Sequence, residues 1–355
     1  MFVLGLLLAI GVLAFLPKTN FVSALTIPEI NYVVYDEQDN KLFERVGVVV
    51  GDVYIDKYFS KYEVYLVDEI NHIAKARFVE KLQKPNITKK SMTNIATNAD
   101  KKIGLYLTHN DESYLIGDGY DSIYGQGGIH DVCNELAYRL TQKGIHVFLD
   151  ETLHIPHDYY AYSRSKPTAQ KLLSNNLNAI FDIHRDGASR STYAKTTDGV
   201  EHSTVRIVVG QANPYKQQNL QFALYLMSVA ETVCPWLFLD IFYASGHYNQ
   251  DLFEKALLFE MGTYTIEKDL VMETVPYLAE VINTTLFNTT VDEEGDLTIG
   301  SPQSNENPTI DTVLGSYYSG GGGSIKFFTS SLAFIGLLSA IAFFVFQYRK
   351  RKILK

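Results

Sequence analysis

One uncharged segment near the end of the chain separates the sequence into parts that cannot share one soluble fold. Residues 327–348 contain no charged side chain and are mostly apolar. A helix needs roughly 20 such residues to cross the hydrocarbon core of a bilayer. We therefore expect a transmembrane helix over residues 326–348. A buried helix of a globular core is the alternative, and the basic residues that follow argue against it.

The last seven residues, 349–355, are strongly basic. They contain Arg349, Lys350, Arg351, Lys352 and Lys355 and no acidic residue. Basic residues beside a membrane span stay in the cytoplasm, so the part before the span is expected to lie outside the cytoplasmic membrane. Residues 291–325 connect the two parts, and the glycine run at 320–323 is typical of a flexible tether.

The first 24 residues form a second apolar segment. Residues 2–16 are apolar, and Ser23 and Ala24 are small residues suited to signal cleavage. Either a cleaved signal peptide or a short uncleaved anchor fits residues 1–24. Both alternatives export the chain from residue 25 onward, and we expect a location at the cell membrane.

Charge narrows the choice of partners. The 355 residues include 31 Lys and Arg against 40 Asp and Glu, a net charge of -9. Because nucleic-acid binding needs clustered basic residues, we expect no nucleic-acid partner. With 46% hydrophobic and 20% charged residues, the composition argues against disorder. The two cysteines, Cys133 and Cys234, are expected to be free buried thiols, with a disulfide bond as the alternative.

The exported part has two regions of different pattern. Residues 25–83 alternate apolar and polar side chains around 48–50 and 53–55, which predicts a small accessory unit with strands. Residues 84–100 are polar and are expected to be a linker. From 101 to 290, predicted strands and helices alternate, which favours an α/β fold with a mixed, largely parallel sheet flanked by helices. The predicted strands are 103–107, 145–149, 179–183, 205–209 and 256–259, and the predicted helices are 131–143, 167–174, 215–233 and 266–287.

Polar side chains capable of catalysis follow three of these strands. His109 and Glu112 follow the first strand, His184 follows the third, and Glu260 follows the last. Residues beyond the carboxyl ends of parallel strands gather at one edge of the sheet. Two histidines and a carboxylate are the ligands of a catalytic zinc site with one open position. The alternatives are structural histidines, a salt-bridged loop at 184–186, and a paired structural carboxylate at Glu260.

Five ordered motifs carry a resemblance to a known family. They are THNDESY at 108–114, FDIHRD at 181–186, VVGQANP at 208–214, YNQDL at 248–252 and ALLFEMG at 256–262. In these motifs, spread over residues 103–283, the chain resembles the stage II sporulation protein P family, exported cell-wall hydrolases of spore-forming bacteria. The resemblance gives no information about residues 25–100.

The resemblance implies an activity and a set of site residues. The family looks like a branch of the zinc-dependent N-acetylmuramoyl-L-alanine amidases, and its members are also associated with cleavage of peptide cross-links. It implies Zn²⁺ held by His109, His184 and Glu112, with Glu260 as the catalytic carboxylate. His130 or Asp131 is the alternative third ligand. Arg185 would bind a stem-peptide carboxylate or the developing oxyanion, or else pair with Asp186.

We therefore expect a membrane-tethered peptidoglycan hydrolase, a zinc-dependent N-acetylmuramoyl-L-alanine amidase with endopeptidase action as an addition. Its expected partners are peptidoglycan, the cytoplasmic membrane, a glycan-cleaving wall enzyme and other sporulation membrane proteins. A non-catalytic wall-binding or scaffold protein on the same fold is the alternative. Family members usually have an N-terminal anchor, whereas this chain has a second apolar segment at its C-terminal end.

Overall fold

The computed structural model describes residues 31–90, 100–158, 160–291 and 297–300. The segments 1–24 and 326–355, where we predicted a signal or anchor, a membrane span and a basic tail, lie outside the described residues. Within the described part of the chain, none of the helices is both long and apolar enough to cross a membrane.

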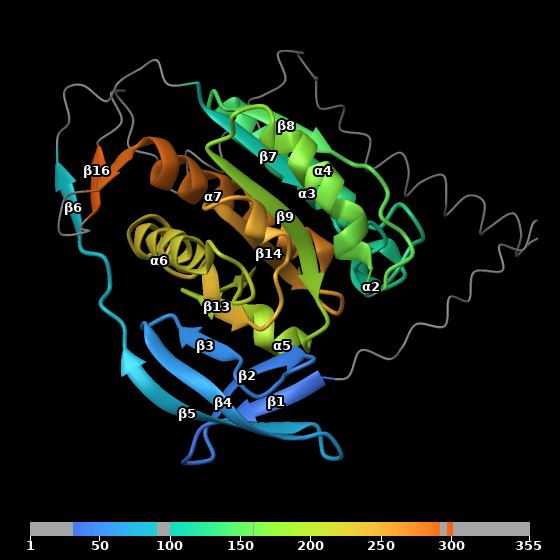
Figure 1. The fold of residues 1–355 in the computed structure, drawn as a ribbon, viewed down its shortest axis with the longest axis vertical. Coiled ribbons are helices and arrows are strands. Elements are labelled where there is room, and N and C mark those ends of the chain that lie inside the picture. Colours follow the sequence, from blue (N-terminus) through green and yellow to red (C-terminus); the bar gives the residue numbers. More distant parts are fainter. Residues whose placement is uncertain (1–30, 91–99, 159, 292–296, 301–355) are drawn as a thin grey trace, which may run out of the picture. The chain divides into compact units, whose positions relative to one another are not determined.

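A single large mixed sheet organises the described residues (Figure 1). Its eleven strands, in spatial order, are β2 (Lys41–Val46), β1 (Asn31–Tyr35), β5 (Ile73–Lys81), β4 (Ser60–Asp68), β3 (Val53–Asp56), β13 (Phe238–Ala244), β12 (Val205–Gly210), β14 (Ala256–Thr263), β9 (Ala179–Asp186), β7 (Lys102–Tyr106) and β8 (His146–Asp150). Two smaller sheets are formed by β10 (Ala194–Thr197) with β11 (Val200–Ser203), and by β15 (Thr289–Val291), β16 (Leu297–Gly300) and β6 (Ile87–Lys90).

Strand direction changes once inside the central part of the sheet. β8, β7, β9 and β14 are parallel neighbours, so their carboxyl ends lie at one edge. β12 and β13 are parallel to each other, and β12 is antiparallel to β14. The predicted mixed sheet is therefore confirmed, and its parallel character is strongest where the candidate site residues lie.

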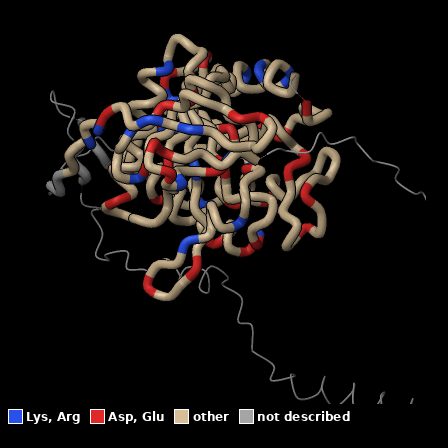
Figure 2. Tube along the Cα trace, turned by 90° about the horizontal axis from the view of Figure 1, so that it is seen from below, with Lys and Arg blue, Asp and Glu red and all other residues tan. Residues whose placement is uncertain are grey.

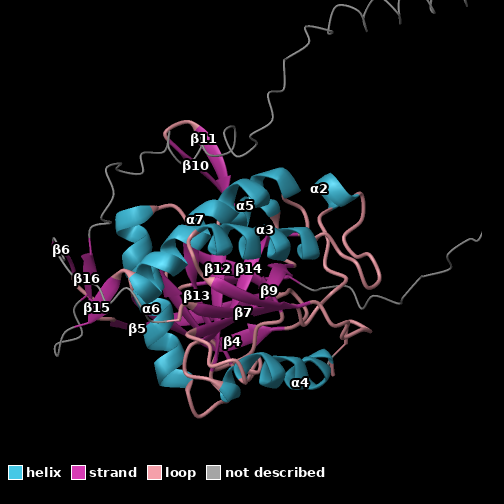
Figure 3. Ribbon diagram, turned by 90° about the horizontal axis from the view of Figure 1, so that it is seen from above, coloured by secondary structure: helices cyan, strands magenta, loops and turns pink. Residues whose placement is uncertain are grey.

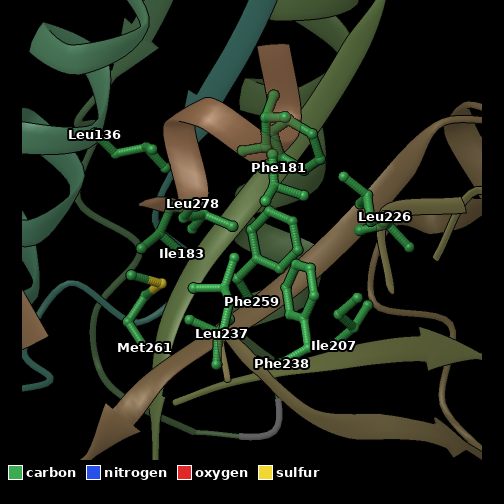
Figure 4. Packing of buried hydrophobic residues seen from close by; sticks show 14 of the residues in the cluster. Leu136, Phe181, Ile183, Ile207, Leu226, Leu237, Phe238, Phe259, Met261 and Leu278 are labelled. Carbon is green, nitrogen blue, oxygen red and sulfur yellow. The ribbon is translucent and has the colours of Figure 1, made fainter. Parts of the chain in front are cut away.

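Helices cover both faces of the sheet (Figure 3). The helices are α2 (Leu115–Asp118), α3 (Ile129–Gln142), α4 (Ala161–Leu173), α5 (Arg190–Tyr193), α6 (Lys216–Val233) and α7 (Lys268–Phe287), with a 3₁₀ turn at Gln250–Leu252. α3, α6 and α7 share one hydrophobic cluster with alternate residues of the central strands. In that cluster the rings of Phe181 and Phe259 stack at a centroid distance of 4.9 Å (Figure 4).

The opposite face of the sheet is covered by two different elements. α4 packs over β7 and β9 through Ala169 and Leu172. The N-terminal strands curl over β12 and β13, where Phe43 of β2 packs on Phe242 of β13 at 5.5 Å. Because side chains alternate along a strand, His184 and Glu260 point to this second face. The face between α4 and the N-terminal strands therefore contains the candidate site.

Residues 31–81, which we expected to form an accessory unit, contribute five strands to the same large sheet. β3 pairs with β13 in antiparallel register, from Asp56 opposite Asp240 to Val53 opposite Tyr243. Residues 87–90 of the expected linker form β6, which pairs with β16. The rest of the predicted division into domains stays a prediction.

Most predicted elements of the central region are present, whereas the short elements α2, α5, β10 and β11 were not predicted. The helix predicted at 167–174 begins six residues earlier, since α4 includes Pro167 in its interior. β9 and β14 continue to Asp186 and Thr263, past the predicted strand ends. β13 was not predicted. Its apolar run is interrupted by the buried Asp240, which is paired with Arg206.

Two predictions from composition can be compared with the described residues. Cys133 and Cys234 are both buried and free, which confirms the free-thiol interpretation. Acidic and basic residues are interspersed along the chain in the view of Figure 2. Local ion pairs among them include Arg190 with Glu201 and Glu267.

Candidate metal site

The loop after β7 is folded tightly around the side chain of Glu112. The N–H of Gly127 donates to the carbonyl of Asn110 at 2.8 Å, and the N–H of Ile129 donates to the carbonyl of Glu112 at 3.1 Å. A Cβ atom on Gly127 would lie 2.0 Å from the carbonyl oxygen of Glu112, so only glycine allows this approach. The loop thus fixes Glu112 and His109 against the end of β9.

Three predicted ligands meet at this point. Nδ1 of His109 lies 3.1 Å from Oε1 of Glu112, and Nδ1 of His184 lies 3.4 Å from the same oxygen. The other carboxylate oxygen, Oε2, accepts the backbone N–H of Arg185 at 2.9 Å. Glu112 is 3% exposed and His184 is 2% exposed, so these contacts are shielded from water.

The spacing of these donor atoms suits a tetrahedral metal ion. Ligands at about 2.0–2.1 Å from zinc in tetrahedral geometry lie about 3.3 Å from one another. The two distances from Glu112 Oε1 bracket that value. These two separations, and the imidazole and carboxylate donors themselves, are compatible with a Zn²⁺ site at Glu112.

The ionisation of His109 and Glu112 agrees with metal binding. Burial lowers the pKa of His109 to about 4, which leaves the imidazole neutral at physiological pH. Burial would raise the pKa of Glu112, but His184 and His109 outweigh it and hold the pKa well below the usual value. Metal binding requires neutral imidazole and ionised carboxylate, so His109 and Glu112 are in the required forms.

His184 carries the charge of the metal-free cluster. Burial would lower its pKa, but the carboxylates of Asp182 and Glu112 raise it well above the usual value. Its Nε2 atom lies 3.0 Å from Oδ1 of Asp182 and has no hydrogen bond of good geometry. The protonated ring of His184 thus lies between the carboxylates of Asp182 and Glu112. A divalent cation bound there could supply the positive charge in place of the proton on His184.

Asp182 forms a second layer behind the ligands. Oδ1 accepts the backbone N–H of Thr108 at 2.9 Å, and Oδ2 accepts the Thr108 hydroxyl at 2.6 Å. A carboxylate beside the second ring nitrogen of a metal-binding histidine orients that ring and increases its basicity. We missed Asp182 as a site residue. Its place two residues before His184, on the same face of a strand, was the available signal.

Glu260 is beside His184 in the sheet, because the two residues are register partners in β14 and β9. It is 7% exposed, and its Oε2 atom is buried without a hydrogen-bond partner. Burial and, secondly, the charge of Asp186 raise the pKa of Glu260 to about 8. A carboxyl group with a pKa close to neutral can both accept and return a proton.

His157 also belongs to this region, which sequence reasoning missed. Its ring stacks on His109 at a centroid distance of 3.7 Å, and His109, Glu112 and His157 each offer a ligand atom within 4.8 Å of the others. Nδ1 of His157 lies 3.0 Å from Oδ1 of Asp111, which raises its pKa although burial alone would lower it. It follows β8, the parallel neighbour of β7, and that position was its only sequence signal.

The remaining candidates lie elsewhere. Arg185 points away from His184, and its guanidinium donates to the carbonyls of Ser113 and Asp121 at 3.3 and 3.1 Å. Asp186, the suggested partner of Arg185, is paired with Arg206 at 2.7 Å. The hydrogen bonds from Arg185 to Ser113 and Asp121 support the loop that carries Glu112. A catalytic role for Arg185 stays a prediction.

The two alternative third ligands have other partners. Nδ1 of His130 lies 2.8 Å from Oε1 of Glu151. Asp131 is paired with Lys268 on the surface. Glu112 is therefore the residue that the fold brings beside both His109 and His184.

Comparison with known proteins gives one family. A family model described as stage II sporulation protein P matches residues 57–283. Stage II sporulation protein P of Bacillus subtilis strain 168 is 29% identical over 199 residues, a match that covers 47% of this chain and 46% of that protein. The matched part thus spans about half the length of that relative.

Among solved structures, the chain is similar to the CwlD amidase of Clostridioides difficile, solved in complex with the GerS lipoprotein. The TM-score is 0.38 at 18% identity, covering 52% of this chain and 95% of that one. The apo N-acetylmuramyl-L-alanine amidase Ami1 of Mycobacterium abscessus gives a TM-score of 0.35 at 13% identity, covering 52% of this chain and 96% of that one. Both similarities are too weak to support a shared function.

Proposed function

The chain belongs to the stage II sporulation protein P family, and from this premise we propose that it is a zinc-dependent N-acetylmuramoyl-L-alanine amidase acting on peptidoglycan. The observation that carries the proposal is the position of two histidines: Nδ1 of His109 and Nδ1 of His184 lie 3.1 and 3.4 Å from the same oxygen, Oε1 of Glu112. Glu260 lies beside His184 in the sheet. A bound zinc ion would polarise the scissile carbonyl and lower the pKa of a coordinated water to about 7.

Glu260 performs the proton transfer in this proposal. Its unpaired Oε2 atom takes the proton from the attacking water and later delivers it to the nitrogen of the leaving amine. With a pKa raised to about 8, the Glu260 carboxylate accepts a proton more readily than an ordinary carboxylate. Burial keeps bulk water from competing for that proton.

The neighbouring residues hold the ligands in place. Asp182 lies against Nε2 of His184, and Thr108 fixes both oxygens of Asp182. Tyr162 of α4 presents its ring edge to His109 at a centroid distance of 5.5 Å and lies 6.2 Å from His184. These contacts restrict ring rotation of both histidines, so the donor atoms remain directed at one point.

Digestion of sacculi tests the proposal directly. The purified full chain, loaded with zinc, should release stem peptides and leave a free lactyl group on muramic acid, as read by mass spectrometry. A chelator should abolish release, and zinc should restore it. Glu260→Gln should lower turnover by a factor of about 10²–10⁴, whereas the matched change at the exposed Glu254 should have no effect.

The products also separate the competing activities. Split cross-bridges with intact lactyl amides would indicate an endopeptidase. Sacculus binding without any release, unchanged in Glu260→Gln, would indicate a wall-binding protein and contradict the proposal. Release that a chelator leaves unchanged would contradict the zinc mechanism.

The proposed location rests on residues 326–355 of the sequence. We propose that the catalytic part lies outside the cytoplasmic membrane and is tethered by the span at 326–348. An epitope tag after Lys355 should resist protease added to intact protoplasts, while the catalytic part is digested. Digestion of the tag would contradict the proposed orientation.

A further inference from the structure

An arginine from outside the matched region reaches the candidate site. Arg45 is on β2, whereas the family match begins at residue 57. Its guanidinium carbon lies 4.1 Å from the ring centroid of Phe242 on β13. Phe43, two residues earlier on β2, packs on the same ring. The inner side of β2 thus brings Arg45 onto the face of the sheet that contains Glu260.

Backbone contacts place Arg45 near Glu260. The carbonyl of Glu44, the preceding residue, accepts a hydrogen bond from Nη1 of Arg206 at 3.0 Å. Arg206 is the register partner of Glu260 across β12 and β14. In keeping with this proximity, the charges of Tyr248, Asp186 and Glu260 together raise the pKa of Arg45 against the effect of its burial.

Arg45 has a buried donor without a partner. Its Nη1 atom is shielded from solvent and forms no hydrogen bond, and its Nε atom donates to the neighbouring carbonyl of Val46 at 3.3 Å. Among the described residues it forms no ion pair with a carboxylate, in contrast to Arg206. An unsatisfied buried donor on a cation is unfavourable for the free protein. A carboxylate that displaces the groups covering Nη1 and accepts its hydrogen bond would therefore gain affinity.

Aromatic rings connect Arg45 with the ligand histidines. Burial raises the pKa of Tyr248, an effect that the neighbouring Arg45 guanidinium opposes, and the Tyr248 ring meets Tyr162 edge to face at 5.3 Å. Tyr162 in turn lies against His109 and His184. Arg45, Tyr248, Tyr162 and the ligand cluster therefore form one contiguous surface, with Glu260 beside it.

From this arrangement we propose that Arg45 binds a carboxylate of the substrate peptide on the leaving-group side of the scissile amide. The proposal rests on the proposed function. Glu260 delivers its proton to the amine that leaves, so groups beyond Glu260 face the peptide half of the substrate. The first free carboxyl in that half is the α-carboxyl of the second residue, a D-glutamate linked through its γ-carboxyl. Arg45 thus selects wall peptides with a free acid there over peptides with the corresponding amide.

Two soluble muropeptides that differ only at this group test the proposal. One has D-glutamate as the second peptide residue, and the other has D-isoglutamine. The zinc-loaded full chain should cleave the acid with a kcat/KM about 10–100-fold higher, mainly through KM, because a charge-assisted pair is lost in the amide. Arg45→Met should lower kcat/KM for the acid by that factor and leave the amide unchanged. Arg45→Lys should retain an intermediate preference.

Binding without turnover provides the second measurement. Calorimetry on the Glu260→Gln variant should show the same preference for the acid, and the preference should disappear in the variant that also has Arg45→Met. Arg77→Met is the matched control, since Arg77 is in the same set of N-terminal strands and its pair with Glu63 is exposed. That change should leave both substrates unaffected.

Each outcome decides one of the two proposals. An equal loss for acid and amide in Arg45→Met would show a structural part for Arg45 and overturn the inference. Equal use of both substrates by the unmodified chain would also overturn it. If the unmodified chain cleaves neither substrate, the amidase proposal fails, and the calorimetric preference alone decides Arg45. If Arg45→Met does not fold, Arg45→Gln and Arg45→Lys are judged by the same ratio.

Discussion

Two clusters of buried charge lie side by side on the same face of the sheet, and they are built in opposite ways. In the first, Arg206 pairs with Asp186 at 2.7 Å and with Asp240 at 2.7 and 3.0 Å, and Tyr193 donates to Asp186 at 2.8 Å. In the second, Glu260 Oε2 and His184 Nε2 are buried without hydrogen bonds.

The difference separates a structural cluster from a site. The Arg206 cluster joins β9, β12 and β13 to the carbonyl of Glu44 on β2, so it attaches the N-terminal strands to the central sheet. Its bonds are internal, which leaves little capacity for a ligand. The Glu260 cluster has excess negative charge and open hydrogen-bonding positions, and such arrangements are maintained at functional sites at a cost in stability.

The largest effect is expected from breaking the satisfied cluster. Arg206→Met leaves Asp186 and Asp240 buried without their cation, and loss of one partner from a buried ion pair costs about 3–5 kcal/mol. Urea unfolding should show this fall in the free energy of unfolding. A fall below about 1 kcal/mol would show that the cluster does not hold the strands together.

Removing the carboxyl group of Glu260 from the second cluster should raise the free energy of unfolding, whereas Arg206→Met lowers it. The pKa of Glu260 is raised from 4.5 to about 8, so the folded protein retains a proton that the unfolded chain releases between these pH values. Stability from this group therefore falls as pH rises through that window. Metal-free Glu260→Gln should be more stable than the unmodified chain above pH 8, by about 1.4 kcal/mol for each unit by which the pKa of Glu260 is raised.

Unfolding in urea at pH 5, 7 and 9, with a chelator present, measures that difference. The advantage of Glu260→Gln should grow between pH 5 and pH 8 and then level off. Glu254→Gln, at an exposed position, should show a flat difference. Parallel pH profiles for Glu260→Gln and the unmodified chain would contradict the strain assigned to this carboxyl group.

A smaller loss is expected in the second layer of the site. Thr108→Val keeps the shape of the side chain but removes the hydroxyl that donates to Oδ2 of Asp182 at 2.6 Å. A buried acceptor that loses its partner costs about 1–3 kcal/mol. The same unfolding assay should show the loss, and Thr141→Val on the exposed side of α3 is the control. Equal stability in both variants would mean that water replaces the hydroxyl.

The smallest effect is expected at the surface. Arg77→Met removes an ion pair with Glu63 in which both side chains are more than a third exposed. Exposed pairs contribute less than about 1 kcal/mol. The free energy of unfolding of Arg77→Met should therefore lie within about 1 kcal/mol of that of the unmodified chain. A fall in this free energy as large as that in Arg206→Met would show that burial is not what distinguishes the two arginines.

Much of the site could be predicted because strand direction gives long-range order. His109, His184 and Glu260 each follow a strand, and β7, β9 and β14 are parallel, so their ends meet. His157 and Arg45 could not be predicted in this way. His157 is in a long loop after β8. Arg45 is on β2, which pairs with the adjacent β1, and β2 meets the site only through packing of Phe43 on Phe242, a contact between residues distant in sequence.

The fold was least predictable where charge is neutralised by distant partners. Asp240 interrupts an apolar run, and only its pair with Arg206 allows β13 to remain buried. The pattern at 53–55 predicts a strand but cannot name β13 as its neighbour, because the two are separated by nearly the whole central region. The local sequence pattern thus indicates that a strand forms. Which strand it pairs with depends on tertiary contacts between residues that are distant in sequence.

The pairing of β3 with β13 also has a consequence for how the protein forms. β3 is synthesised before all strands of the central region, and β13 after most of them, so the hydrogen-bonding edge of β3 stays open for most of synthesis. Contacts of such sequence separation slow folding and prolong exposure of aggregation-prone edges. The newborn chain should therefore depend on a chaperone until β13 has emerged, and truncations that end before residue 238 should accumulate as insoluble protein.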